Sequence, residues 1–407
     1  MYFTALDVGS SQIKALVVET QKDGRLSVLN VFKTPSSGVR KGEVVSVEDA
    51  VRSLSPLFSE IKHFNKNALR NIFVNVNGAN IKMQNSRGIV AVSHGDNEIY
   101  QEDIDRVVKA SQAVSLSPNR VVLHTLTKEF IVDGIADIID PLGMTGARLE
   151  VNSLIIDAFS PSVKSLMKSV EKAGGSVGGL IYNPLATGAS VLSKSQKELG
   201  AVLVDIGLGT TGVAVFEEDK LLNSAVFPVG AGNVTNDLAI ALKCSVKTAE
   251  AVKINFGCAF AREISAKEKI DLSEFEENLH SAFSRKYLAE IIEARLAEIF
   301  ELVNNELKSI GKAGRLPAGA VLAGGGAKMP GVVELAKKEL KLPSRLGISE
   351  IENLEVKNVN FAERIEDSEF AVALGLLWWA GEKSSAPSAW PKGDKFSLKK
   401  FLKYFTP

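Results

Sequence analysis

The sequence predicts a mixed α/β protein with two similar lobes and an α+β section inserted into the first lobe. Three observations indicate this fold class. Short apolar runs of strand character alternate with stretches of helical spacing. A strand–glycine turn–strand unit at the start of the chain recurs in outline from Ala201. With 407 residues, the chain also exceeds the usual size of a single hydrophobic core.

Apolar patterning places the elements expected in the first lobe and its insert. In the first lobe we expect strands at 3–8, 13–18, 26–32 and 71–76 and a helix at 47–64. Hairpins between these strands distinguish the pattern from strict βαβ alternation. In the insert we expect a helix at 101–115 and strands at 121–126, 130–132 and 147–159. A helix at 162–173 then ends at two glycines.

The second strand–turn–strand unit opens the second lobe. Around its glycine turn we expect strands at 202–204 and 212–216, followed by mostly helical chain at 234–310. That stretch includes a long amphipathic helix at 288–307, and a strand at 320–323 and a helix at 331–340 come after it. We divide the chain into a first-lobe core (1–82, 161–195 and 360–380), an inserted α+β subdomain (83–160), a second-lobe core (196–231 and 305–359), a helical subdomain (232–304), a flexible linker (381–393) and a terminal amphipathic helix (394–407).

Composition argues against several classes of protein. Lysine plus arginine equals aspartate plus glutamate, at 48 each, so no nucleic-acid partner is expected. The two cysteines, Cys244 and Cys258, lack metal-type spacing. The N-terminus lacks the basic segment of a signal peptide, and the longest apolar stretch, 370–380, is too short to span a bilayer. Any membrane association should therefore be peripheral.

Three glycine-rich turns end apolar strands. They are Asp7-Val8-Gly9-Ser10-Ser11, Asp205-Ile206-Gly207-Leu208-Gly209-Thr210-Thr211 and Ala323-Gly324-Gly325-Gly326. Glycine lets backbone N–H groups approach an anion, and the hydroxyl groups add donors. The leading aspartates, Asp7 and Asp205, could hold Mg²⁺ through water beside phosphates. One such turn alone is consistent with an ordinary tight turn, whereas three in this order indicate a phosphate-binding site.

These turns resemble the phosphate and adenosine loops of the actin, chaperone and sugar-kinase ATPase superfamily. The resemblance implies ATP and Mg²⁺ between two lobes, with Lys14 behind the first loop. Glu250 and Lys253 share one helical face and match the family pair that reaches ribose and adenine, although a surface ion pair is the alternative. The cofactor-binding residues that the resemblance implies are Gly9, Ser10, Ser11, Lys14, Gly207, Leu208, Gly209, Thr210, Thr211, Gly230, Asn233, Glu250, Lys253, Gly324, Gly325, Gly326 and Met329.

Longer segments resemble the FtsA family of bacterial cell-division proteins, almost continuously from Met1 to Trp379. They include HTLTKEFIVDG at 124–134 and DPLGMTG at 140–146. The resemblance implies an actin-like two-lobed ATPase fold in which the insert replaces one actin subdomain. It also implies self-assembly into actin-like filaments, with FtsZ filaments anchored to the cytoplasmic face of the cell membrane at the division site.

Three positions depart from these families. Leu208 and Gly212 stand where glycine and aspartate are usual in the second phosphate loop, and Asn183 stands where glutamate usually precedes Pro-Leu-Ala. The two lost carboxylates would help to order the metal's water shell and the attacking water. Each lost contact could cost on the order of 3 kcal/mol, or about a hundredfold in rate. We therefore expect ATP to bind as a structural ligand and to be hydrolysed weakly or not at all.

The end of the sequence has the pattern of a basic amphipathic helix. Apolar residues from Leu398 to Phe405 share one helical face, opposite three lysines. Such a helix suits an anionic lipid surface, as the FtsA resemblance also implies, although docking on the protein's own core is the alternative. The residues expected to contact the membrane are Phe396, Leu398, Lys399, Lys400, Phe401, Leu402, Lys403 and Phe405.

A partner site is expected on the helical subdomain. The FtsA resemblance implies that the FtsZ C-terminal peptide binds there, with the partner-binding positions falling on Arg295 and Glu298. An exposed intrahelical salt bridge between these two side chains is the alternative. Other divisome proteins are further candidate partners.

Three other functions compete with this interpretation. A PilM-like cytoplasmic pilus-assembly adaptor would share the fold but should lack the basic tail. A small-molecule kinase would need an acidic catalytic base, and two expected carboxylates are absent. A chaperone would need a β-rich peptide-binding domain after the ATPase core.

Overall fold

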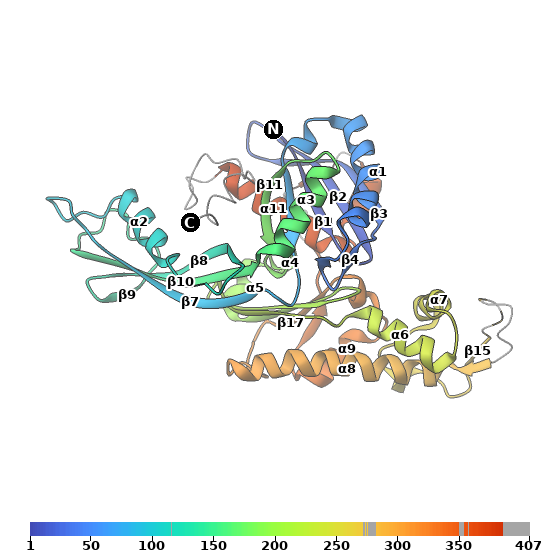
Figure 1. Cartoon of the computed structure of the whole chain (residues 1–407). Helices are drawn as coiled ribbons and strands as arrows, with labels where there is room; N and C mark the ends of the chain where they lie inside the picture. Colours follow the sequence, from blue (N-terminus) through green and yellow to red (C-terminus); the bar gives the residue numbers. More distant parts are fainter. Residues whose placement is uncertain are drawn as a thin grey trace.

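The computed structural model describes residues 1–385, except 115, 272, 274, 276–281, 350–353 and 357. It has two lobes and an inserted subdomain that extends to one side of them (Figure 1). The terminal amphipathic helix expected at 394–407 lies outside the described residues, and so do the residues from Phe396 to Phe405 that were expected to contact the membrane.

The first lobe is built on a six-stranded mixed sheet. Its strands, in order across the sheet, are β11 (Val177–Tyr182), β6 (Ile72–Val76), β1 (Tyr2–Val8), β2 (Gln12–Thr20), β3 (Leu26–Pro35) and β19 (Leu354–Val356). Strands β1, β2 and β3 form an antiparallel meander, while β6 is parallel to β1 and β11 is parallel to β6. The central strands β1 and β2 are buried on both faces, which accounts for their nearly continuous apolar sequence.

The second lobe repeats the same arrangement in a five-stranded sheet. Its strands, in order, are β14 (Lys220–Phe227), β13 (Thr211–Glu217), β12 (Ala201–Ile206), β17 (Gly319–Ala323) and β18 (Ser344–Leu346). Three antiparallel strands are again followed by two parallel ones. The internal duplication predicted from the two strand–turn–strand units is thus confirmed, with β12 in the place of β1.

Helices cover both faces of the first-lobe sheet (Figure 1). On one face, α1 (Val47–Asn65) and α3 (Ser160–Lys172) pack against alternate side chains of β1 and β2. The other face carries α11 (Ala371–Ser385) together with α4 (Asn183–Val191). Helices α4 and α11 pack very closely, because a Cβ at Gly375 would lie 1.7 Å from the carbonyl oxygen of Ala186.

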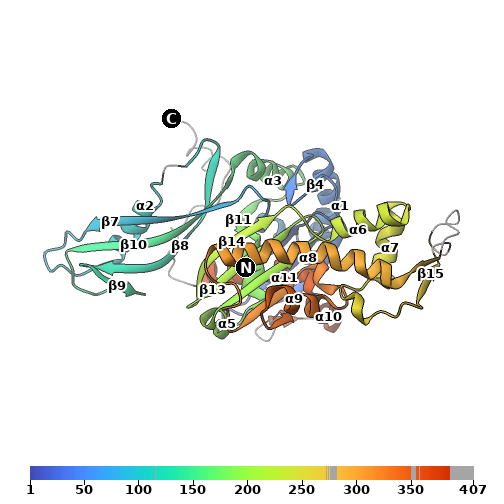
Figure 2. The same cartoon turned by 90° about the horizontal axis from the view of Figure 1, so that it is seen from below.

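The second lobe packs four helices in one large apolar core against β12, β13 and β17. These helices are α6 (Ala231–Leu242), α7 (Val246–Phe256), α8 (Arg285–Ser309) and α9 (Val332–Leu340), whereas the short α5 (Lys194–Leu199) has no buried residue. Helix α8 is the long amphipathic helix predicted at 288–307, and it runs the length of this lobe (Figure 2). Ser284 begins it by accepting a hydrogen bond from the backbone N–H of Tyr287 at 3.5 Å.

The insert is a four-stranded antiparallel sheet with one helix. Its elements are β7 (Lys82–Ala91), α2 (Gln101–Ser111), β8 (Arg120–Val132), β9 (Ile135–Ile138) and β10 (Arg148–Phe159). The strands expected at 121–126 and 130–132 form one strand, β8. An irregularity in its pairing with β10 between Asn152 and Ser153 lets β8 continue, which the apolar pattern did not reveal.

The remaining described elements are short. They are β4 (Val39–Arg40), β5 (Glu43–Val44), η1 (Ala68–Arg70), η2 (Ala261–Glu263), β15 (Lys269–Asp271), β16 (Ala282–Ser284), η4 (Gly325–Lys328), α10 (Val359–Ile365) and η5 (Ser368–Phe370).

Two expected boundaries differ from the structure. Strand β19 joins the first-lobe sheet, although 305–359 was assigned to the second lobe. Helix α11 continues to Ser385, into the expected linker 381–393.

Within the described part of the chain, no helix combines the length and the apolar character needed to cross a membrane. The apolar stretch in α11 is instead packed on the first-lobe sheet, where Leu374 and Leu377 are fully buried.

Candidate functional site

A cavity of about 470 Å³ is lined by residues from both lobes. The three glycine turns meet there, although they are far apart in the sequence. The residues predicted from sequence that line it are Asp7, Gly9, Ser10, Ser11, Lys14, Asp205, Gly207, Leu208, Gly209, Thr210, Glu250, Lys253, Gly324, Gly325, Gly326 and Met329. A volume of this size is typical of a site for a small molecule or cofactor.

The first two turns have equivalent geometry in the two lobes. The backbone N–H of Gly9 donates to the carbonyl of Gln12 at 3.1 Å, and that of Gly207 donates to the carbonyl of Thr210 at 2.8 Å. Each turn joins two antiparallel strands, and each begins just after an aspartate at the end of its strand. The duplicated fold therefore places Asp7 and Asp205 at equivalent positions facing one cavity.

The third turn can form only with glycine at its first position. Gly324 has a φ of +81°, and a Cβ there would lie 2.4 Å from Oδ1 of Asp205. The turn is also fixed to η5, because the N–H of Gly324 donates to the carbonyl of Ser368 at 3.3 Å. Gly325 differs, since a Cβ there would meet nothing within 4 Å. It borders open cavity.

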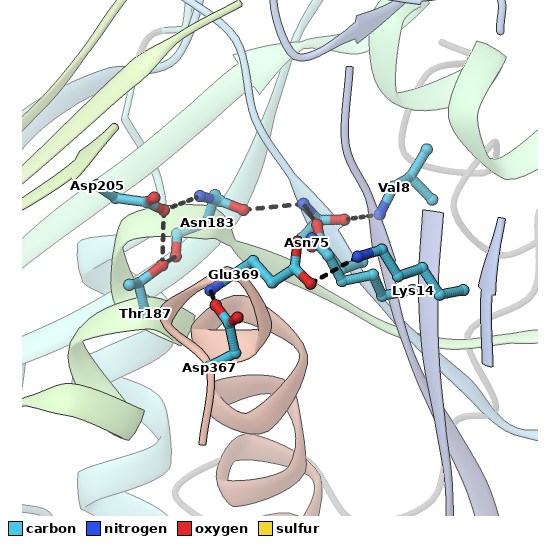
Figure 3. Close-up of polar contacts among 10 residues, drawn as sticks. Val8, Lys14, Asn75, Asn183, Thr187, Asp205, Asp367 and Glu369 are labelled. Carbon is cyan, nitrogen blue, oxygen red and sulfur yellow. Dashed lines mark hydrogen bonds and ion pairs between the residues drawn. The ribbon is translucent and has the colours of Figure 1, made fainter. Parts of the chain in front are cut away.

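A continuous chain of hydrogen bonds joins the two aspartates, and Figure 3 shows its part from Asn75 through Asn183 to Asp205. The side-chain amide of Asn75 donates to Oδ1 of Asp7 at 2.9 Å and to Oδ1 of Asn183 at 2.8 Å. Asn183 in turn donates to Oδ2 of Asp205 at 3.0 Å. Because Asn75 lies near the end of β6 and Asn183 begins α4, the first lobe reaches across to the aspartate of the second lobe.

Each aspartate has one further polar partner. The ammonium group of Lys14 lies 3.3 Å from Oδ2 of Asp7. The hydroxyl of Thr187 donates to Oδ2 of Asp205 at 2.9 Å. Lys14 is opposite Asp7 in the β1–β2 pairing, whereas Gly212 is opposite Asp205 in the β12–β13 pairing. The second lobe therefore has no lysine equivalent to Lys14.

Burial raises the pKa of both carboxyl groups. For Asp205 the pKa reaches about 6, chiefly through burial, with a smaller contribution from the charge of Asp7, while the hydrogen bond from Thr187 opposes the shift. For Asp7, burial again raises the pKa most, and the ion pair with Lys14 opposes it. A bound cation would stabilise both ionised forms.

The two aspartates fit Mg²⁺ of the kind that accompanies a nucleotide. Among the described residues, no group of three or more His, Cys, Asp or Glu side chains forms a complete metal site. Mg²⁺ does not need one, because it is usually bound by one or two carboxylates, water and substrate phosphates. Asp7 and Asp205 supply the two carboxylates for such a site, and the glycine turns beside them leave room for the phosphates.

Glu250 and Lys253 form the ion pair that their spacing permits, at 2.7 Å, and both line the cavity. Lys253 also donates to the hydroxyl of Thr235 at 2.9 Å, which ties α7 to α6. Its side chain is 7% exposed, so the pair is not an ordinary surface ion pair. Both groups reach the cavity from α7, which belongs to the helical subdomain.

Three predicted residues do not line the cavity. The Thr211 hydroxyl donates to the carbonyl of Val229 at 2.9 Å, so it supports the loop from behind. Asn233 accepts a hydrogen bond from the N–H of Gly230 at 3.1 Å and thereby caps α6. A Cβ at Gly230 would lie 2.4 Å from the carbonyl oxygen of Gly207, so this glycine permits the close approach of α6.

Several lining residues were not predicted from sequence. They include Gln12, Asn75, Asn77, Lys328 and Glu369. Gln12 accepts the hydrogen bond that closes the first glycine turn, and Lys328 ends η4, which contains Gly325 and Gly326. Asn75, Asn77 and Glu369 belong to no glycine turn and come from the end of β6, from the residue after this strand and from η5. The only local signal was the pair of asparagines in Asn75-Val76-Asn77 at the end of an apolar strand.

The departures at the second loop have structural explanations. A Cβ at Gly212 would lie 3.2 Å from Cγ of Pro184, so an aspartate there would crowd α4. A glutamate at position 183 would bring a third carboxylate beside Asp205, where Asn183 instead donates a hydrogen bond. The amide of Asn183 thus stabilises the ionised form of Asp205, whereas a carboxylate at position 183 would disfavour that form by charge repulsion.

Arg295 and Glu298 form an ion pair within α8, which is the salt bridge given above as the alternative to a partner-binding role. Arg295 also makes a two-pronged contact with Asp237 of α6, at 2.6 and 3.0 Å. Its side chain is 29% exposed, against 59% for Glu298. Arg295 is therefore committed mainly to holding α6 and α8 together, and Glu298 is the more available of the two.

Known proteins similar in sequence are cell-division proteins. A family model described as "Cell division protein FtsA" matches residues 202–375, and one described as "SHS2 domain inserted in FTSA" matches 78–157. The chain is 37% identical to "Cell division protein FtsA" of Pseudomonas aeruginosa, over 93% of this chain and 89% of that protein. It is also 37% identical to the protein of that name from Bacillus subtilis, over 93% and 83%.

Solved structures with a similar fold include bacterial actin relatives. A chain of a "PilM-PilN type IV pilus biogenesis complex" superposes with a TM-score of 0.64 at 17% identity, over 93% of this chain and 98% of that one. MreB5 of Spiroplasma citri bound to ADP superposes with a TM-score of 0.56 at 14% identity, over 94% and 98%. These likenesses confirm the predicted actin-like two-lobed fold, and the SHS2 match identifies the insert.

We predict that Asp205→Asn stabilises the protein in the absence of ligands at neutral pH. The folded pKa of about 6 exceeds the ordinary 3.8, so the folded protein retains a proton that the unfolded chain releases as the pH rises. Wild-type stability should fall between about pH 4 and pH 6. Above that window the variant should be more stable by up to ~3 kcal/mol, at about 1.4 kcal/mol per pH unit.

Urea unfolding of both proteins from about pH 4 to pH 8 checks this expectation. The two curves should converge near pH 4. Asp219→Asn is the matched control, because Asp219 lies in an exposed turn, and it should follow the wild type throughout. Equal stability of Asp205→Asn and wild type at every pH would contradict the assigned burial cost.

Proposed function

Because this chain belongs to the FtsA family of cell-division proteins, we propose that it binds ATP with Mg²⁺ between its lobes and links FtsZ filaments to the cytoplasmic membrane. The observation that carries the proposal is the convergence of three glycine turns and two buried aspartates on one cavity. The family relationship places the chain among actin-like cell-division proteins. The nucleotide, the partner and the membrane contact are the proposed parts.

Each turn has a separate role in the proposed nucleotide site. Gly9 and Gly207 use their N–H groups to close the two turns, so the N–H groups that would face the phosphates are those of Ser10 and Ser11 in one lobe and of Leu208, Gly209 and Thr210 in the other. Lys14, whose contact with Asp7 at 3.3 Å is long for an ion pair, can turn to a phosphate oxygen. Glu250, Lys253 and Met329 line the part assigned to the ribose and the base.

Asp7 and Asp205 would hold Mg²⁺, chiefly through its water ligands, and the ion would neutralise phosphate charge. MreB5 of Spiroplasma citri, which shares the fold, has been solved both with ADP and with AMPPNP, and this supports a nucleotide in the equivalent cleft here. Because the two proteins are only 14% identical, the nucleotide site proposed for this chain rests on its own residues.

We propose that ATP acts mainly as a structural ligand. Asn183 and Gly212 leave the second loop without the carboxylates that could orient an attacking water. ATP contacting both lobes would instead favour the closed arrangement and self-association. A purified protein that turned over ATP at roughly tens per second, in the usual range of efficient enzymes, would contradict this role.

Self-association would strengthen a weak membrane anchor. A single short amphipathic helix binds lipid reversibly, whereas many copies in one filament bind with high avidity. The basic amphipathic pattern at 394–407 supplies such an anchor in the proposal. Glu298 on α8, with the helical subdomain around it, is the proposed contact for the FtsZ peptide.

A PilM-like adaptor function is less well supported. The PilM structure has a higher TM-score than MreB5, but its 17% identity bears on the fold alone. The relatives at 37% identity over 93% of the chain are FtsA proteins. A PilM-like cytoplasmic adaptor would also be expected to lack the basic amphipathic tail that this sequence has.

We predict that Gly325→Phe abolishes ATP binding without destabilising the fold. A side chain at this position meets no atom within 4 Å of its Cβ and would project into the cavity. Calorimetric titration with Mg²⁺ and ATP should show affinity reduced by at least about a hundredfold, as expected when a bulky group occupies a binding cavity. Gly95→Phe is the matched control, because Gly95 also has open space but lies outside the cavity. Undiminished binding by Gly325→Phe would place the nucleotide elsewhere.

Membrane attachment is tested by truncation. A chain ending at Ser388 should keep ATP binding but lose co-sedimentation with anionic vesicles and the recruitment of FtsZ to them. Phe401→Glu in the full chain should reproduce the loss, because a charge then interrupts the apolar face of the amphipathic pattern. If the truncated chain still carries FtsZ to vesicles, the anchor is not at the C-terminal end.

A further inference from the structure

Asn75, Asn183 and Thr187 surround the two aspartates, and none of the three is assigned a function by the family comparison. All are deeply buried, with relative exposures of 3%, 4% and 0%. Asn75 is at the end of β6, while the other two lie one turn apart on α4. Figure 3 shows them as a polar row between the lobes.

The orientation of the Asn75 amide is fixed by its partners. Its oxygen accepts a hydrogen bond from the backbone N–H of Val8 at 2.7 Å. Its nitrogen donates both hydrogens, one to Asp7 and the other to Asn183. A flipped amide would lose all three contacts, so the amide can present only a donor to Oδ1 of Asp7.

The same reasoning fixes Asn183. Its oxygen accepts from Asn75, so its nitrogen must face Oδ2 of Asp205. The Thr187 hydroxyl donates to that same oxygen at 2.9 Å. Among the described residues, no hydrogen bond reaches Oδ1 of Asp205, which borders Gly324 at the cavity.

We propose that Asn75, Asn183 and Thr187 are positioning residues for the Mg²⁺ of a bound nucleotide. They hold Oδ1 of Asp7 and Oδ2 of Asp205. Oδ1 of Asp205 is then aimed at the ion, and so is Oδ2 of Asp7 once Lys14, which contacts it at 3.3 Å, turns to a phosphate oxygen. The inference rests on the proposed function. Donors behind a carboxylate fix the direction in which its free oxygen points, and such partners typically change metal affinity by about 10- to 100-fold. In this protein the row takes the place of the usual glutamate at position 183 and orients two carboxylates at once.

A purely structural role makes a different prediction. If the row only ties the lobes together, its loss should weaken ATP binding equally with and without Mg²⁺. If it orients Asp7 and Asp205, its loss should reduce mainly the gain in affinity that Mg²⁺ provides. The ratio of ATP affinity in Mg²⁺ to that in EDTA separates the two roles.

The test is calorimetric titration of the full chain with ATP, in Mg²⁺ and in EDTA. Thr187→Val is the main variant, because it removes the hydroxyl and keeps the shape at a buried site, and Asn75→Ala is the second. For both variants we expect the Mg²⁺ gain to fall by about tenfold, while affinity in EDTA stays within about twofold of the wild type, and melting temperatures confirm folding.

Asn80→Ala is the matched control. Asn80 follows the same strand but is exposed and lies outside the cavity lining, and its amide donates to Oε1 of Glu43 at 3.1 Å. The control should keep the full Mg²⁺ gain. An unchanged gain in Thr187→Val and Asn75→Ala, or an equal loss in Asn80→Ala, would overturn the inference while leaving the nucleotide site intact. A wild type that binds no ATP would overturn the proposed function as well.

Discussion

The burial of two carboxylates between the lobes is the constraint on which the rest of the site depends. Asp7 and Asp205 are 5% and 6% exposed, and burial raises the pKa of both. An ionised carboxylate in such a place must be stabilised by donors or by a cation. The amide row supplies donors on one side, and the open cavity leaves room for a cation on the other. The ion of a metal-bound polyphosphate would compensate the charge of both carboxylates, and its phosphates would occupy the cavity.

The duplicated fold explains how two such aspartates come to face each other. Each lobe places its aspartate at the end of a central strand, just before a tight turn into an antiparallel neighbour. The parallel strand β17 then delivers the third turn beside the second, where only glycine at 324 fits against Asp205. Ligand contacts from both lobes would couple occupancy to lobe closure, which is the physical link between nucleotide and self-association in the proposal.

Sequence reasoning predicted the parts of this arrangement that local chemistry determines. Glycine turns after apolar strands were sufficient to locate the three turns that line the cavity, and helical spacing located α8. Asn75 could not be identified in this way, because its role depends on pairing with Asn183, which lies on a helix 108 residues further along the chain. Thr211 and Asn233 were assigned to the ligand, yet they support the loops from behind. The pairing of β19 with the first-lobe sheet could not be predicted either, because a strand of three residues is too short to show a recognisable alternation of apolar side chains.

The central claim is that glycine turns from both lobes close around one Mg²⁺-bound triphosphate. The most direct measurement is a crystal structure of the full chain grown with Mg²⁺ and AMPPNP. The account predicts phosphates between Gly9–Ser11 and Gly207–Thr210, with the ion on the side of Asp7 and Asp205. Nucleotide density outside this cavity, or phosphates contacting only one lobe, would contradict it.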